Sequence, residues 1–490
     1  MTSRPGTSGP DADRARWRAF AVCLGAGFMT LLDVSIVNVA LPSIEASLGA
    51  GPSELQWIVA GYTLAFGLAL IPAGRLGDVL GRRGAFVAGL LGFVAFSAAC
   101  GLATSAEMLA VMRLLQGLSA GVLNPQVIGL IQHLFQGHER GRAFGFYGAA
   151  IGISTATGPL LGGTLIALFG EAEGWRSVFL VNVPIGAVLV PLALRYLPRA
   201  ERQRSGGMGV DVVGLVLIAA SVVCVMLPFI VAAEGPDASP WWLVLVGLAI
   251  VGLLVLWERW TERAGRSPVV PSSLVRTPSF SLGAVVGTAY FAGFTGIFLV
   301  GTLYLQTGLG LTPLLAGVVQ TPFALVGAVS AARSGYLVQR FGRWTVVAGI
   351  GVMAAGIVGV DVTVGSTEGN GAAVAMAGWL ALAGLGNGVV ISPNQTLTLA
   401  EVPVAQGGTA GGVLQTTQRI GAAVGVAVIA SVFFATLGRS RGGLAGGYGP
   451  ALSVGLRVTL GLLAVAFVVA LLDALRRRHG PVSAAGPPPA

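Results

Sequence analysis

The sequence lacks lysine altogether, and charged residues make up only 10% of its 490 positions. Hydrophobic residues make up 54%, with 75 glycines and a mean hydropathy of +0.82. Because soluble globular domains carry about 25% charged residues, this composition excludes an ordinary soluble protein. The chain is therefore predicted to be an integral membrane protein surrounded by a lipid bilayer.

Cysteine and histidine are also scarce, with three of each. Cys23, Cys100 and Cys224 lie inside apolar runs and lack the spacing of metal ligands. We interpret them as packing residues, with neither a disulfide framework nor a metal site. No HExxH, GxSxG or phosphate-binding glycine loop occurs. Neither an enzyme nor a site for a nucleotide or another cofactor is therefore expected.

The net charge of +9 comes from 29 basic residues, all of them arginine, against 20 acidic residues. These arginines are scattered between apolar runs rather than gathered on one polar face. This distribution argues against nucleic-acid binding and suits the loops of a membrane protein.

A helix needs about 20 mostly apolar residues to cross a bilayer. Fourteen such runs occur, which predicts an all-α integral membrane fold with fourteen transmembrane helices. They lie at 18–43, 54–74, 84–103, 107–132, 143–169, 176–197, 211–233, 240–260, 279–306, 312–338, 344–364, 372–400, 406–436 and 452–474. The first run is too long for a cleaved signal peptide. The tail GPVSAAGPPPA is predicted to be disordered.

The arginines also predict the orientation of the chain. With the N-terminus in the cytoplasm, 22 arginines fall in the two tails and the inner loops, and only four fall in the outer loops. The positive-inside rule therefore places both termini in the cytoplasm, in a multi-pass protein of the cytoplasmic membrane. The arginines left within spans are Arg113, Arg333 and Arg419.

Three segments recur at a nearly constant offset, which indicates an internal repeat. GRLGDVLGRR and GYLVQRFGRW lie 261 residues apart, GLSAGVLNP and GLGNGVVISP 267, and GPLLGG and GAAVG 263. The chain is therefore predicted to contain two six-helix halves, 18–197 and 278–475, with an inserted two-helix hairpin within 198–277. Residues 1–17 and 476–490 form the cytoplasmic tails. Paired halves of this kind build alternating access in secondary transporters.

The loop after the second span, GRLGDVLGRR, places an acid among arginines and glycines. Such an acid can form charge-assisted contacts to a neighbouring helix end, which break when the halves move apart. An ordinary solvated loop is the alternative. In the second copy Gln339 stands in place of the acid, so the contact should be asymmetric. The residues concerned are Gly74, Asp78, Gly81, Arg82 and Arg83.

Two spans carry further motifs. In RLLQGLSAG of the fourth span, Arg113 should pair with another group or face water, with snorkelling to the membrane interface as the alternative. In GISTATGPLLGG of the fifth span, small residues allow close helix packing and a proline bends the helix. The residues of this second motif are Gly158, Pro159, Gly162 and Gly163.

Together with LLDVSIVNVALP in the first span and LQWIVAGYTLAFG in the second, these segments resemble the major facilitator superfamily. Within it, they resemble the fourteen-span drug:proton antiporter branch of the EmrB/QacA type. The resemblance covers residues 18 to 475 approximately. It implies a gating role for the loop after the second span and a proton-relay role for Arg113. It also implies that the Gly158 motif seals an exporter against proton leak.

Asp33 is the one acidic residue that falls well inside a predicted span. It lies 15 residues beyond Arg18, or about 23 Å along a helix, in a hydrocarbon core of about 30 Å. A charged Asp there costs about 2.5 to 3.5 kcal/mol, so it should face the protein interior or a wet cavity. Competition between a proton and a cation for this carboxylate would be a minimal antiport mechanism. A structural Asp that holds a neighbouring helix is the alternative.

The resemblance also implies a substrate cavity between the two halves. Aromatic and amide side chains in an apolar cavity suit bulky amphipathic substrates better than sugars. We expect only half of the candidates to touch substrate, because each could instead bind a neighbouring helix. Arg419 could be structural or could favour anionic or neutral substrates. The candidates are Asn38, Tyr62, Gln126, Tyr147, Tyr304, Gln320, Asn387, Asn394, Gln415 and Arg419.

The function expected from the residues and the resemblance is export of amphipathic drugs or antibiotics in exchange for protons. The proton gradient supplies the energy without a cofactor, and the expected partners are small amphipathic substrates, protons and the bilayer. A monomer is expected. The alternative is a dedicated proton-coupled exporter of one endogenous metabolite, antibiotic or lipid-like molecule.

Overall fold

The computed structural model of the chain describes residues 10–170, 173–198, 211–232, 239–366, 369–439 and 443–476. Within these ranges every regular element is a helix. Fourteen helical segments of the described chain are long and apolar enough to cross a membrane. The predicted all-α membrane fold with fourteen spans is confirmed.

The helices follow the predicted spans in order. The first six spans are α1 (Pro10–Leu48), α2 (Pro52–Leu80), α3 (Arg82–Gly101), α4 (Ala106–Leu134), α5 (Gly137–Phe169) and the pair α6 (Trp175–Leu180) and α7 (Asn182–Tyr196). The inserted segment contains α8 (Val212–Ala232), α9 (Trp242–Arg263) and the short α10 (Ser272–Arg276). The last six spans are α11 (Pro278–Leu303) with the π-helical turn η2 (Tyr304–Gly308), α12 (Pro313–Phe341), α13 (Trp344–Ser366), α14 (Gly369–Thr398), α15 (Gly407–Arg439), which follows the 3₁₀ turn η3 (Val404–Gln406), and α16 (Gly443–Arg476).

Parts of the predicted tails and linkers lie outside the described residues. These parts are residues 1–9, 199–210 and 477–490. The helix α1 begins at Pro10, well before the predicted span start at residue 18.

The sixth span is interrupted, although the sequence predicts one helix over 176–197. The helix α6 ends at Leu180 and α7 begins at Asn182. Pro184 has no backbone N–H to donate to the carbonyl of Leu180, which favours a break at this point. The break leaves the side chain of Asn182 fully buried in the N-terminal half.

Two large hydrophobic clusters form the core, one centred on the N-terminal half that continues into α11 and α15, and one within the C-terminal half. Phe86, Phe93 and Phe144 are buried in the N-terminal half, and Met353 and Phe433 are buried in the C-terminal half. Inside a bilayer such clusters stabilise the fold through close packing, since lipid tails are as apolar as the side chains.

The inserted helix α8 packs against both halves. Val222 and Met226 of α8 form a buried cluster with Ile71 of α2, and Val413 of α15 packs against the same cluster. The helix α9 instead exposes apolar side chains such as Leu245, as expected for a lipid-facing helix. The α8 and α9 pair therefore covers one side of the boundary between the halves.

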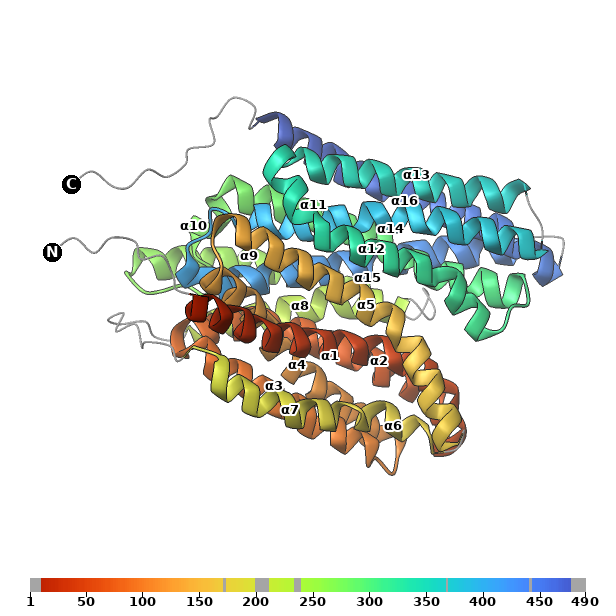
Figure 1. Ribbon diagram of the computed structural model, residues 1–490, viewed down its shortest axis with the longest axis horizontal. Helices are drawn as coiled ribbons and strands as arrows, with labels where there is room; N and C mark the ends of the chain where they lie inside the picture. Colours follow the sequence, from red (N-terminus) through yellow and green to blue (C-terminus); the bar gives the residue numbers. More distant parts are fainter. Residues whose placement is uncertain are drawn as a thin grey trace.

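The halves approach each other closely at one end of the bundle, which holds the first residue of α1 and the last of α16 (Figure 1). We call it the terminus-bearing end. There a Cβ on Gly335 of α12 would lie 2.9 Å from the carbonyl carbon of Gly141 of α5, and a Cβ on Gly74 of α2 would collide with the carbonyl oxygen of Gly408 of α15. Toward the opposite end, the red-to-yellow N-terminal half and the blue part of the C-terminal half diverge (Figure 1). The halves are thus joined at the terminus-bearing end.

Candidate functional site

A buried charged cluster lies in the middle of the N-terminal half, where α1, α4 and the break between α6 and α7 meet. Asp33 of α1 is 0% exposed. Its Oδ2 accepts a hydrogen bond from Arg113 Nη1 at 2.6 Å, and its Oδ1 accepts from Gln116 Nε2 at 2.9 Å and Asn182 Nδ2 at 3.0 Å. Three donors therefore surround one carboxylate, and a positive charge balances it.

Arg113 is held on every side. Its side chain is 2% exposed, so it does not snorkel to a membrane surface in this structure. Besides the bond to Asp33, its Nε donates to the carbonyl of Ile58 at 3.1 Å and its Nη1 donates to Gln116 Oε1 at 2.8 Å. The guanidinium also lies over the ring of Tyr62, 4.1 Å from the centroid. A buried ion pair persists only when such additional contacts offset its desolvation.

Asn182 is a member of this cluster that the sequence interpretation missed. Its Nδ2 donates to Ser97 Oγ at 3.0 Å as well as to Asp33, and Ser97 Oγ donates to the carbonyl of Phe179 at 2.9 Å. The signal in the sequence is an amide inside an apolar run, two residues before a proline, in VNVPIG. Asn182 thus links the charged cluster to α3 and to the helix break.

Two aromatic rings of α2 connect the charged cluster to the C-terminal half. Tyr62 and Phe66 are one helical turn apart and stack at 6.2 Å between centroids with an interplanar angle of 21°. Arg113 lies over Tyr62, and Arg419 of α15 lies over Phe66 at 4.7 Å. We call Arg113, Tyr62, Phe66 and Arg419 the cation–aromatic stack. Arg419 forms no ion pair with any residue that the structure describes.

Glycines of α4 allow this stack to form. A Cβ on Gly117 would collide with the carbonyl of Tyr62, and a Cβ on Gly121 would lie 2.5 Å from the carbonyl of Phe66. The RLLQGLSAG segment therefore places Arg113 against α2 and lets the two backbones touch.

Asp78 joins the two halves at the terminus-bearing end. Its side chain is only 2% exposed, unlike that of a solvated loop residue. Oδ1 accepts from the backbone N–H of Gly408 at 3.0 Å, and Oδ2 accepts from the backbone N–H and hydroxyl of Thr409 at 2.8 and 2.9 Å. A carboxylate at a helix N-terminus is favoured by the helix dipole. Asp78 of α2 therefore caps the start of α15 in the other half.

The arginines of the same loop complete this junction. Arg82 donates to Asp78 Oδ1 at 2.8 Å, to the carbonyl of Gly129 at 2.7 Å, and to the carbonyl of Val404 in the C-terminal half. Arg83 donates to the carbonyl of Leu194 of α7. Gly81 between the helices has φ +109°, which an L side chain rarely adopts.

The equivalent loop of the C-terminal half is different. Gln339, at the position of Asp78, donates only within its own helix, to the carbonyl of Gly335 at 3.1 Å. Arg343 pairs with Asp473 of α16, inside the same half. The junction made by Asp78 has no counterpart at this loop among the described residues.

The glycines of the Gly158 motif pack α5 against α1. A Cβ on Gly158 would collide with Ser35, and a Cβ on Gly162 would lie 2.9 Å from Ile36 Cγ1, whereas Gly163 faces open space. Ser35 Oγ also donates to the carbonyl of Thr155 at 2.9 Å. The side chain of Pro159 lies outside the described part of the structure.

Five of the predicted cavity residues are engaged by other helices. Their side chains bond to backbone or side-chain groups rather than standing free. The bonds are Gln126 Nε2 to Ala73 O at 2.8 Å, Tyr147 Oη to Asn124 Oδ1 at 3.3 Å, Gln320 Nε2 to Thr302 Oγ1 at 3.0 Å, Tyr290 Oη to Asn387 Oδ1 at 2.7 Å and Asn394 Nδ2 to Gly283 O at 2.9 Å.

The other candidates are less constrained or lie elsewhere. Asn38 is exposed and donates only to Val34 O of its own helix at 3.4 Å. Tyr304 is buried in η2, and the buried Nε2 of Gln415 has no partner. The structure thus brings Asp33, Arg113, Tyr62 and Arg419 into one connected group, with Tyr147 in the same buried cluster as Tyr62. No cluster of three or more metal-ligating side chains occurs in the described chain.

Comparison with known proteins gives a consistent result. The family model of the Major Facilitator Superfamily matches residues 23–426. The chain is 38% identical over 435 residues to the probable actinorhodin transporter of Streptomyces coelicolor, covering 88% of this chain and 75% of that one. It is 34% identical over 425 residues to the multidrug resistance protein Stp of Mycobacterium tuberculosis, covering 85% and 76%. The human organic anion transporter MFSD10 shares the fold, with a TM-score of 0.63 at 17% identity over 93% of this chain and 100% of that one.

Proposed function

Because the chain belongs to the major facilitator superfamily, it is a membrane transporter and not an enzyme, and we propose that it exports amphipathic drugs or antibiotics in exchange for protons. The observation that carries this proposal is the buried pair of Asp33 and Arg113, 2.6 Å apart in an apolar half. An isolated charge would be costly there, so a paired acid in a span is a functional candidate.

Protonation of Asp33 changes the cluster in a defined way. All three neighbours donate to the carboxylate, so each contact needs an acceptor oxygen. A proton on Oδ2 removes the negative charge and adds an O–H donor, which weakens the charge-assisted bond from Arg113 Nη1. Arg113 keeps its charge and its contacts to Ile58, Gln116 and Tyr62. Proton uptake therefore weakens the attraction between Arg113 and Asp33 and leaves Arg113 held by its other contacts.

The cation–aromatic stack offers a route from this event to the boundary between the halves. Arg113 lies over Tyr62, Tyr62 stacks on Phe66, and Phe66 carries Arg419 of α15. The same helix α15 is capped by Asp78 at the terminus-bearing end. Movement of Arg113 would thus bias the α2 and α15 contact that closes this end, which is the change that alternating access requires.

We assign the terminus-bearing end to the cytoplasm, in a cytoplasmic membrane. The 22 arginines of the tails and inner loops support this orientation through the positive-inside rule. With this assignment the described arrangement, joined at the terminus-bearing end, is the outward-facing state of the transporter.

The C-terminal half supplies groups that suit amphipathic substrates with planar rings. Phe294 and Phe298 of α11 pack with Phe323 of α12, at 6.4 and 5.0 Å between centroids. Arg419, without an acidic partner in the described chain, favours anionic or neutral amphiphiles over dications. The names of both relatives, a probable actinorhodin transporter and a multidrug resistance protein, support transport of antibiotics or drugs.

A dedicated exporter of one antibiotic is the second candidate. It is favoured by the relative at 38% identity, whose name specifies one compound. Expression in a pump-deficient host separates the two candidates. A multidrug exporter raises tolerance to several unrelated amphipathic compounds, whereas a dedicated one raises tolerance to one.

The proton coupling is tested in everted membrane vesicles. An imposed pH gradient should drive substrate uptake by the wild type, and Asp33→Asn should abolish it when vesicles with equal amounts of folded transporter are compared. Normal gradient-driven uptake by Asp33→Asn would overturn the proposal.

A further inference from the structure

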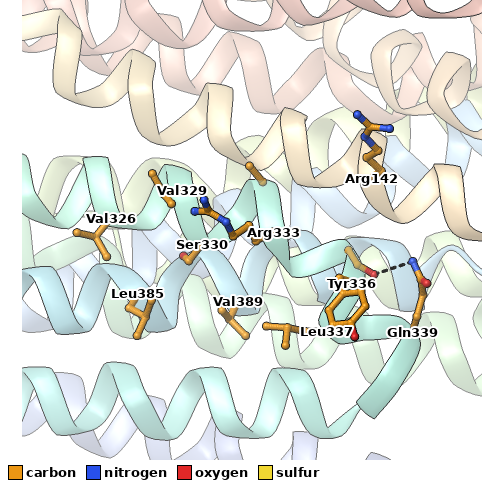
Figure 2. A pocket seen from close by; sticks show the side chains of 12 residues that line it. Arg142, Val326, Val329, Ser330, Arg333, Tyr336, Leu337, Gln339, Leu385 and Val389 are labelled. Atoms are coloured by element: carbon orange, nitrogen blue, oxygen red, sulfur yellow. Dashed lines mark hydrogen bonds between the residues drawn. The ribbon is translucent and has the colours of Figure 1, made fainter.

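A groove of about 610 Å³ lies on the flank of the bundle where α12, α14 and the first turns of α5 meet (Figure 2). Its walls are largely apolar, with Val326 and Val329 from α12 and Leu385 and Val389 from α14. Figure 2 shows Arg333 on α12, between these apolar side chains and Tyr336. This groove belongs neither to the charged cluster nor to the cation–aromatic stack.

Two arginines line the groove, one from each half of the molecule. Arg142 belongs to α5 and Arg333 to α12, and no acidic residue lines the groove. Arg333 is exposed and has neither a hydrogen bond nor an ion pair with a described residue. Arg142 contacts the rings of Trp17 and Phe146 and pairs with no described acid. Arg333 thus places a positive charge in the groove, and Arg142 lies at the edge of the groove with its guanidinium directed away from α12 (Figure 2).

The depth of these side chains matches the headgroup level of one leaflet. The helix α12 has 29 residues, or about 44 Å, against a hydrocarbon core of about 30 Å. Arg333 precedes the helix end at Phe341 by eight residues, or about 12 Å. With the helix centred on the core, its backbone lies about 5 Å inside the hydrocarbon boundary on the terminus-bearing side, from which a long arginine side chain reaches the headgroups. Tyr336, 65% exposed, lies still closer to this interface, where tyrosine is enriched.

The two flanks of the boundary between the halves differ in whether a carboxylate joins them. At the α2 and α15 flank, α8 covers the boundary and the carboxylate of Asp78 joins the halves. At the α5 and α12 flank, Gln339 stands in place of the acid and lines the groove. The second flank therefore has positive groups from both halves and lacks the anion that would join them.

We propose that this groove binds an anionic phospholipid from the leaflet at the terminus-bearing end. The phosphate lies at Arg333, the Arg142 guanidinium turns toward it from the rings of Trp17 and Phe146, and an acyl chain follows Val326, Val329 and Leu385. Basic pockets between transmembrane helices are suited to anionic headgroups. The lipid bridges α5 to α12 and stabilises the arrangement in which the halves are joined at this end.

Native mass spectrometry of the purified full-length protein tests this site. The probes are phosphatidylglycerol, phosphatidylcholine and inorganic phosphate, each added to delipidated protein. We expect phosphatidylglycerol to bind more tightly than phosphatidylcholine, and inorganic phosphate neither to bind nor to displace it. Equal binding of the two lipids, or displacement of phosphatidylglycerol by inorganic phosphate, would contradict a phospholipid site.

Matched variants locate the site. Arg333→Gln and Arg142→Gln should each weaken phosphatidylglycerol binding about fivefold, and Arg333→Lys should retain most of it. Arg340→Gln removes an equal charge from an exposed position of the same helix outside the groove, and should bind like the wild type. Unchanged binding by the Arg142→Gln and Arg333→Gln double variant, eluting normally in size exclusion, would overturn the proposal.

Discussion

The positions that hold Asp33 and Arg113 in the N-terminal half are charged, whereas the positions that the repeat offset equates with them in the C-terminal half are aromatic and aliphatic. With the repeat offset of 261 residues, Asp33 of α1 corresponds to Phe294 of α11, and with the offset of 267, Arg113 of α4 corresponds to Leu380 of α14. Phe294 stacks on the ring of Tyr290 at 5.4 Å, and Leu380 is buried in the cluster around it. The two predicted repeats therefore place different chemistry at positions that the repeat offset equates.

The same contrast recurs at the terminus-bearing end. Asp78 caps the first turn of α15 in the opposite half, but its counterpart Gln339 bonds only to its own helix. Three pairs of equivalent positions are thus available: Asp33 and Phe294, Arg113 and Leu380, and Asp78 and Gln339. In each pair the residue of the N-terminal half is charged and its counterpart is not. We infer that the two halves differ in function: the N-terminal half carries the proton chemistry, and the C-terminal half provides apolar contacts at the equivalent positions.

The largest expected effect comes from breaking the buried pair. Arg113→Leu, which copies Leu380 of the other half, leaves Asp33 buried with an uncompensated charge and should destabilise the protein by about 3–5 kcal/mol. Chemical unfolding in detergent measures this loss. Adding Asp33→Leu should recover most of it, because the pair is then replaced by apolar groups. A single variant as stable as the wild type would mean that the pair carries little energy.

Asp78→Asn should have the next largest effect. It removes the charge from the contacts to Gly408 and Thr409 and should weaken the junction by about 1.5–3 kcal/mol. Cysteine cross-linking between α2 and α15 at the terminus-bearing end should then become slower. Gln339→Asn, the matched change in the other half, should leave this rate unaltered. An equal effect of both changes would contradict the asymmetry.

Asn182→Ala should cost about 1.5 kcal/mol of unfolding free energy, since it removes a donor to the charged Asp33. Asn387→Ala removes a bond between neutral groups, to Tyr290, and should cost about 0.5–1 kcal/mol. Thermal unfolding of the two variants compares them directly. A larger loss of unfolding free energy for Asn387→Ala than for Asn182→Ala would contradict the expectation that the bond to the charged Asp33 is the stronger of the two.

Phe294→Leu should have the smallest effect, and this effect should be on substrate affinity. It removes ring contacts with Phe298 and Phe323, which lowers affinity for a planar substrate by about 0.5–1.5 kcal/mol. The KM of vesicle uptake should rise while uptake remains driven by the pH gradient. Loss of gradient coupling in this variant would place proton chemistry in the C-terminal half as well.

The fold was predictable because span length and arginine distribution are strong signals in a membrane protein. Fourteen apolar runs correspond to fourteen helical segments. The interruption of the sixth span was not predicted, since an apolar run of the right length conceals a break that depends on Pro184 and on the partners of Asn182.

The candidate site was predictable where a residue type is costly in a bilayer. Asp33 and Arg113 stand out in sequence for that reason, and the structure brings them into contact; their role in proton coupling stays a prediction. Amides such as Gln126 and Asn394 gave no such signal, because an amide can bind a cavity ligand or a neighbouring backbone equally well. Only packing decides between these two uses.

The most direct test of the claim that proton chemistry lies in the N-terminal half is the release of protons on substrate binding. Purified protein in weakly buffered detergent solution, with a pH-sensitive dye, should release protons when an exported substrate is added. Phe294→Leu should release the same amount at a higher substrate concentration, and Asp33→Asn should release none while still binding substrate. Release of the wild-type amount by Asp33→Asn would contradict the account.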